Sequence, residues 1–229
     1  MQSLHLQSIA LALLAAVSLS ACQSTPKGTD SLDELSTSEG LARVESKQVA
    51  LLYVRPQASL AGYSKFLIKP VEVQFAKHWN PESQSSGSVL YRMGDVDREK
   101  IKSELGDAFV DVFKQEMAKG GYALVTDPGE DVLEIQAALV NLYINAPDPS
   151  QVAGQTRVYT TDAGEMTLVM QLHDSVTGQL LARTVDRQAA SHQFWNWTTS
   201  VSNTADARRI IDGWATSLRK AFDAARSTT

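Results

Sequence analysis

The apolar stretch at residues 9–19 constrains this chain more than any other feature, because it decides where the rest of the chain folds. Its length of about a dozen residues is well short of the roughly 20 that a helix needs to span the hydrocarbon core of a bilayer. An apolar run of this size, followed by the small residues Ser20 and Ala21, is typical of a secretory signal peptide. We therefore predict that residues 1–21 are a signal peptide and are removed from the mature protein.

Cys22 is the only cysteine in the chain, so it cannot form an intramolecular disulfide bond. Residues 19–22 read LSAC and resemble the lipobox of bacterial lipoproteins, in which the cysteine sulfur carries a diacylglycerol. We predict that Cys22 is the lipid-attachment site, where several acyl chains, at about 0.8 kcal/mol per buried CH₂, form a permanent membrane anchor. The alternative is an ordinary signal-peptidase site beside Ala21, with Cys22 incidental. By resemblance to bacterial sorting rules, Gln23 in place of Asp implies the outer membrane, and we expect the domain to face the periplasm.

Charge and composition limit the partners of the mature chain. The 229 residues include 26 acidic and 21 basic side chains, a net charge of −5, so no basic surface is expected for phosphate backbones. We predict no nucleic-acid partner. With 43% apolar residues and no second long apolar run, the chain is expected to meet the membrane only through the lipid on Cys22.

The chain after the signal peptide divides into two parts. Residues 22–47 are rich in Ser, Thr, Gly and charged side chains and poor in bulky apolar ones, which predicts a lipidated flexible tether with room for a short helix at 32–35. Residues 48–229 are long enough for a single domain with a hydrophobic core.

Hydrophobic periodicity within that domain predicts an α+β fold. One amphipathic helix begins at Asp95 or Asp97 and ends at Gly120-Gly121, and a second covers residues 205–226. Alternating or continuous β-prone runs predict the strands, among them a hairpin around the turn at 174–178 and a bulge or edge position at Pro70. These strands are residues 49–54, 65–75, 122–126, 132–144, 165–173 and 180–187. We expect a mixed or antiparallel sheet of about four to six strands, covered by two amphipathic helices.

Short motifs along most of this domain resemble the bacterial lipoprotein family DUF3313, a domain of unknown function. The resemblance runs from about residue 51 to 222. It is carried by YVRP at 53–56, LAGY at 60–63, PVEV at 70–73, KGGY at 119–122, TG at 177–178, DR at 186–187, and AR at 207–208 before Trp214. The resemblance implies an envelope lipoprotein and no particular activity.

Catalytic and metal-binding motifs are not evident in the sequence. His78, His173 and His192 are scattered, and no HExxH, CxxC, GxSxG or phosphate-loop spacing occurs. We therefore predict no catalytic residues, no metal site and no cofactor. An acid–base pair of His173 with Asp174 is one alternative, but an aspartate that caps the turn beside a surface histidine is favoured.

Charged residues on the predicted strands offer a further candidate site. Asp186, Arg187 and Glu72 could form a charged ligand clamp. We favour a structural ion pair or a solvated strand face.

Three aromatic residues fall within four positions of a polar stretch that the sequence predicts as a loop: Phe194, Trp195 and Trp197. Aromatic side chains in exposed loops often anchor partners, because they bury a large rigid area at a small entropic cost. We favour the alternative that Trp195 or Trp197 covers the core beneath the last helix, with the other tryptophan exposed. We name these three as the candidate partner-binding residues.

These observations favour a non-catalytic envelope lipoprotein that binds a protein or polymer partner near the outer membrane. One alternative is an envelope hydrolase, with its acidic and histidine residues gathered only by the fold. Another is a small-ligand-binding lipoprotein, which would have a mostly apolar cavity lined by tryptophan.

Overall fold

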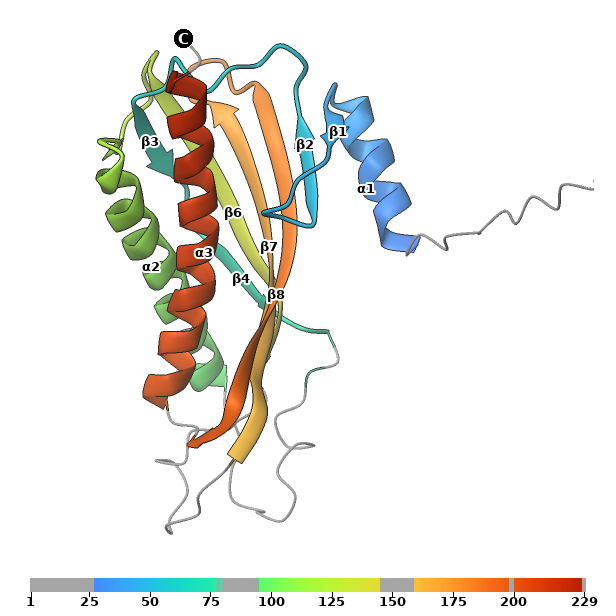
Figure 1. The fold of residues 1–229 in the computed structure, drawn as a ribbon, viewed down its shortest axis with the longest axis vertical. Coiled ribbons are helices and arrows are strands. Elements are labelled where there is room, and N and C mark those ends of the chain that lie inside the picture. Colours follow the sequence, from blue (N-terminus) through green and yellow to red (C-terminus); the bar gives the residue numbers. More distant parts are fainter. Residues whose placement is uncertain (1–26, 78, 80–94, 145–158, 198–199, 228–229) are drawn as a thin grey trace, which may run out of the picture.

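The computed structural model describes residues 27–77, 79, 95–144, 159–197 and 200–227. Within these residues, eight strands form one mixed sheet and three helices flank it (Figure 1). Helices α2 (Asp95–Lys119) and α3 (Ser200–Ser227) lie side by side over the sheet, whereas α1 (Lys27–Ser38) lies apart from them, beside the first two strands. The α+β prediction is confirmed, with more strands than expected and a third helix.

The centre of the sheet is a long antiparallel meander. Its strands are β6 (Val132–Ile144), β7 (Tyr159–Asp174) and β8 (Leu180–Trp197). The remaining strands extend it on both sides, in the order β1 (Ala42–Val44), β2 (Leu51–Val54), β8, β7, β6, β3 (Lys65–Ile68) and β5 (Ala123–Leu124), and β4 (Glu72–Phe75) also pairs with β6.

The predicted hairpin between β7 and β8 is confirmed. Asp174 N–H donates to the Gln179 carbonyl at 3.0 Å, and Gly178 N–H donates to the Asp174 carbonyl at 2.9 Å. Gly178 has a φ of +71°, a conformation that glycine adopts without steric cost. Both strands are longer than the alternation of apolar and polar residues indicated. The ladder between β7 and β8 continues through polar residues as well as apolar ones.

This extension corrects the prediction of an aromatic loop. Trp197 pairs with Tyr159 in the β7–β8 ladder, so residues 194–197 belong to the end of β8. Cross-strand partners stabilise a strand whatever the local hydrophobicity, and they are not visible in a local pattern.

The proline in the predicted strand 65–75 divides it. β3 and β4 each run parallel to β6, β3 beside residues 132–135 and β4 beside residues 138–142. Pro70 lies between them and has no N–H for a sheet ladder. This division, together with the short strand β1, explains why the strand count exceeds the prediction.

The main core lies between the sheet and helices α2 and α3. Helix α2 ends as predicted: Tyr122 N–H donates to the Met117 carbonyl at 3.2 Å, and Gly121 has a φ of +77°. The two helices and the sheet bury aromatic and aliphatic side chains that are at most 3% exposed: Phe66, Phe109, Phe113, Met117, Leu133, Ile135, Leu139, Leu168, Ile211, Trp214 and Phe222. Burial of this apolar surface is the principal driving force for this arrangement.

The prediction of a flexible tether is wrong for much of its length. Residues 27–44 include α1 and β1, and β1 pairs with β2 at the edge of the sheet. The polar side chains that suggested a solvated coil instead contact the sheet, as described below. No helix in the described ranges is long and apolar enough to cross a membrane.

Candidate functional site

Two of the predicted functional positions lie at opposite ends of the chain. Cys22 lies outside the described residues, so lipid attachment there stays a prediction. Phe194, Trp195 and Trp197 occupy the carboxyl end of β8, and their role as partner-binding residues also stays a prediction.

His173 and Asp174 do not form an acid–base pair. The ring nitrogens of His173 lie 3.1 Å from the Gly178 carbonyl oxygen and 3.1 Å from the Gln171 side-chain oxygen. Asp174 Oδ1 accepts the Thr177 N–H at 2.7 Å and its hydroxyl at 2.8 Å, and these bonds lower the pKa of the Asp174 carboxyl. Asp174 therefore caps the hairpin turn, which is the alternative that the sequence favours.

Asp186 is a buried structural carboxylate. Its side chain is 4% exposed and accepts the Ala50 N–H at 2.9 Å and the Trp214 indole N–H at 2.8 Å. Arg187 points away from it and pairs with Glu165 on β7. Asp186 therefore joins the start of β2 to α3, and it does not form the clamp with Arg187 and Glu72 that was considered from the sequence.

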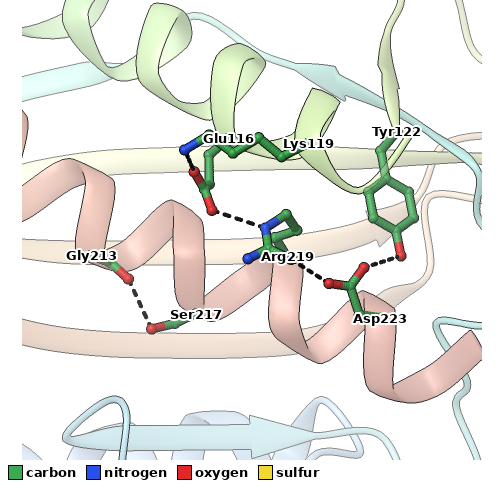
Figure 2. A network of polar contacts seen from close by, with 7 residues as sticks. All are labelled: Glu116, Lys119, Tyr122, Gly213, Ser217, Arg219 and Asp223. Carbon is green, nitrogen blue, oxygen red and sulfur yellow. Dashed lines mark hydrogen bonds and ion pairs between the residues drawn. The ribbon is translucent and has the colours of Figure 1, made fainter. Parts of the chain in front are cut away.

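A second buried carboxylate, Glu116, lies where α2 meets α3 (Figure 2). It is 3% exposed, and it forms ion pairs with Lys119 of its own helix and with Arg219 of α3, whose Nε lies 2.9 Å from Glu116 Oε1. Arg219 also pairs with Asp223, which accepts the Tyr122 hydroxyl at 3.0 Å. This interhelical charge cluster consists of Glu116, Lys119, Tyr122, Arg219 and Asp223.

The charge cluster changes the acidity of its members. Hydrogen bonds from Lys119 and then Arg219 lower the pKa of Glu116 from 4.5 to about 2. Burial, followed by the hydrogen bond to Asp223, raises the pKa of Tyr122. Glu116 is thus held ionised and Tyr122 neutral, a state that stabilises the fold and does not suit proton transfer near neutral pH. The sequence contains a signal for this cluster, since Glu116 interrupts the apolar stripe of α2.

Arg183 is the centre of a third polar cluster, on the sheet face opposite α2 and α3. Ala182 belongs to the main core, and the next side chain of a strand points to the other face. Arg183 is 4% exposed, and its Nη1 lies 3.1 Å from Ser36 Oγ and 2.5 Å from Glu39 Oε2. Nothing in the local sequence of β8 indicates this contact, because its partners belong to the segment predicted as a tether.

An open groove of about 490 Å³ lies between β4 and the first half of α2. It is lined by residues 71–74 of the β4 segment and by Glu99, Lys102 and Ser103. Glu99 and Lys102 are themselves an ion pair, with 2.7 Å between Lys102 Nζ and Glu99 Oε1. The groove is open to solvent and most of its lining residues are polar, in contrast to the apolar, tryptophan-lined cavity that the small-ligand alternative predicts.

No set of three His, Cys, Asp or Glu side chains in the described part of the chain is placed to hold a metal ion. The clusters around Asp174, Asp186 and Glu116 satisfy their acidic oxygens with internal donors. The structure therefore assigns these groups to the stability of the fold.

Comparison with solved structures shows distant likenesses. A minor lipoprotein from Acinetobacter baumannii has 15% identity and a TM-score of 0.39, over 72% of this chain and 95% of that one. The PelC dodecamer from Paraburkholderia phytofirmans has 10% identity and a TM-score of 0.34, over 72% and 96%. A Xanthomonas campestris protein of the DUF330 family has 15% identity and a TM-score of 0.39, over 72% and 86%.

Comparison with protein families gives a firmer result. No curated protein sequence matches the chain significantly. The model of the family described as "Protein of unknown function (DUF3313)" matches residues 33–218, most of the folded region. This match begins within α1, earlier than the resemblance over residues 51–222, and so includes part of the segment predicted as a tether. The chain therefore belongs to the DUF3313 family.

Proposed function

We propose that this protein is a lipid-anchored lipoprotein of the bacterial outer membrane, whose domain faces the periplasm and binds a protein or polymer partner without catalysis. The observation that carries this proposal is the position of the lipobox-like Cys22 directly before a folded domain. The described structure begins at Lys27, and the chain from Cys22 to Lys27 spans at most roughly 18 Å when fully extended. A lipid on Cys22 would hold the domain beside the membrane surface.

The internal bonding of the buried acids gives them a structural role, which fits a function without catalysis at these groups. Glu116 and Asp186 direct their oxygens at fixed donors from other elements, as structural groups do.

The candidate binding residues Phe194, Trp195 and Trp197 lie at the far end of β8 from the strand segment that pairs with β2. Val185 and Trp197 pair with Val169 and Tyr159 of β7, which are ten residues apart, so at roughly 3.3 Å per residue they lie at most about 33 Å apart along the sheet. A partner at the aromatic end would leave the edge beside α1 uncovered.

Fatty-acid labelling tests the anchor. Cells that express the native chain should incorporate labelled palmitate into the protein and retain it in the outer-membrane fraction. The Cys22→Ala variant should lose both. Equal fractionation of the two forms, with no label in either, would contradict the anchor.

Crosslinking in intact cells, followed by mass spectrometry, tests the partner site. The double variant Trp195→Ala, Trp197→Ala should lose a discrete crosslinked partner. The matched control is Val176→Ala, a 61% exposed residue in the β7–β8 turn, and it should keep that partner. If the double variant folds and keeps every partner of the native chain, the aromatic residues are not the binding site.

A second candidate function rests on the groove beside β4. Its polar lining, with Glu72, Glu99 and Lys102, fits a small polar ligand better than an apolar one. Failure of crosslinking to recover any partner, together with chemical-shift changes at these residues on ligand addition, would favour this function.

A further inference from the structure

Helix α1 contacts the domain through polar side chains, unlike the other two helices. Asp33 is half-buried and Ser36 is fully buried, whereas Leu35 is 47% exposed. In α2 and α3, by contrast, the buried stripe is almost entirely apolar. The surface that holds α1 in place is therefore made of hydrogen bonds and ion pairs more than of apolar contacts.

Asp33 and Ser36 of α1, and Glu39 directly after it, make polar contacts with the strands. Asp33 Oδ1 accepts the Tyr53 hydroxyl at 2.7 Å, and Asp33 Oδ2 pairs with Arg43 at 3.2 Å. Ser36 and Glu39 both contact Arg183, as described above.

The carboxyl end of the helix is held by an additional arginine. Arg55 donates to the Glu39 carbonyl at 2.7 Å and to the Leu180 carbonyl at 2.7 Å, and so joins the end of α1 to β8. Gly40 has a φ of +78°, and a Cβ there would lie 2.8 Å from Arg55 Nη1. Gly40 therefore forms the left-handed stop that follows α1, where the Leu41 N–H donates to the Ser36 carbonyl at 2.9 Å.

The polar interface of α1 fixes the position of the helix but contributes little to the free energy that holds it on the sheet. Charged groups lose their hydration when they are paired, which offsets most of the Coulombic gain. Arg183 contacts this segment through the Ser36 hydroxyl and the Glu39 carboxylate, and the Glu39 side chain is 36% exposed, so solvent weakens the ion pair. The small apolar cluster beneath this region consists of Leu41, Tyr53 and Leu180, none of which belongs to α1. A 12-residue helix is also marginally stable without tertiary contacts.

We infer that α1 is a releasable spacer between the proposed lipid anchor and the domain, docked on the sheet by Arg183 and opening at Gly40. This inference rests on the proposed lipidation of Cys22. With α1 docked, the five residue steps from Cys22 to Lys27 can span at most roughly 18 Å. With α1 released and unfolded, the chain from Cys22 to Ala42 has an r.m.s. length of about 25 Å and a limit of about 70 Å. Release therefore lets the domain reach partners further from the membrane.

Hydrogen exchange measured by mass spectrometry tests this device on the full mature chain in liposomes. In the native protein, amides of residues 27–38 should exchange at least tenfold faster than those of residues 105–117 in α2. Arg183→Gln, which loses the ion pair with Glu39, should speed exchange in α1 a further tenfold and leave α2 within twofold. The matched control is Arg187→Gln, since Arg187 lies on the same strand but pairs with Glu165 at the surface. It should leave α1 unchanged.

A second variant keeps the test decisive if Arg183→Gln does not fold. Asp33→Asn changes only the helix side of the interface and should also speed α1 exchange selectively. Exchange in α1 that is as slow as in α2, or that changes equally in both helices, would overturn the inference, because α1 would then open only with the whole domain. Failure of the lipid anchor is seen separately, as loss of palmitate label from a chain whose α1 still exchanges rapidly.

Discussion

Replacement of Glu116 by glutamine should destabilise the protein in a pH-dependent way. The side chain is 3% exposed and bonded to Lys119 and Arg219, which lower its pKa from 4.5 to about 2. At about 1.36 kcal/mol per pKa unit, this difference corresponds to at most about 3 kcal/mol of stabilisation near neutral pH. Solvent reduces this figure because the Lys119 side chain is 64% exposed, so we expect Glu116→Gln to lower the free energy of unfolding by roughly 1–2 kcal/mol at pH 7.

The direction of the pH dependence follows from the lowered pKa. A carboxyl that is more acidic in the folded state stabilises the fold at pH values above its pKa in the unfolded chain. That contribution declines as the pH falls from 4.5 towards 2, where Glu116 becomes protonated even in the folded protein. The stability difference between the native chain and Glu116→Gln should therefore shrink over this range.

Urea denaturation at pH 7, 4 and 2.5 measures the effect, and urea is preferred because guanidinium chloride screens ion pairs. The matched control is Glu99→Gln on the same helix, since Glu99 has a 70% exposed side chain that pairs with Lys102. We expect it to change the free energy of unfolding by less than about 0.5 kcal/mol. The reasoning is refuted if the two variants behave alike, or if the effect of Glu116→Gln is undiminished at pH 2.5.

Three further substitutions test the packing around the helices. Gly120→Ala should lower the free energy of unfolding by about 1–3 kcal/mol in thermal or urea denaturation, because its Cβ would lie 2.4 Å from a ring carbon of Tyr122. Gly213→Ala, an exposed position within α3 with no atom within 4 Å of the added Cβ, should raise it by about 0.5–1 kcal/mol, and a loss would show that α3 is not helical there. Trp214→Phe should cost about 1–3 kcal/mol, since it leaves buried Asp186 without its indole donor, and Asp186→Asn in the same background should then cost less than it does in the native chain.

Elements with local signals were predictable. The stripe of α2, which includes Phe109, Val112 and Phe113, repeats at helical spacing, and its glycine stop lies directly after it. The turn at Asp174–Gly178 is determined by the bonding capacity of its own residues. In both cases the residues that decide the structure lie within one or two turns of each other, so a single sequence is sufficient.

Elements without such signals were missed. Of helix α1, only a short helix at residues 32–35 was anticipated, because its full length depends on contacts of Asp33 and Ser36 with distant strands. The polar end of β8 is a strand because β7 lies beside it. Composition alone indicates a solvated coil for the first segment and a loop for the second, because the stabilising partners are not local.

The candidate sites divide in the same way. The apolar stretch and Cys22 are adjacent in the sequence, and together they predict a signal peptide and a lipid anchor. Both can be recognised without knowledge of the fold. The meeting of Glu116 with Arg219, which are 103 positions apart, and of Trp214 with Asp186, was decided by the tertiary structure alone. A local pattern determines which face of a helix or strand is apolar, whereas the tertiary packing of helices and strands determines which buried charges meet.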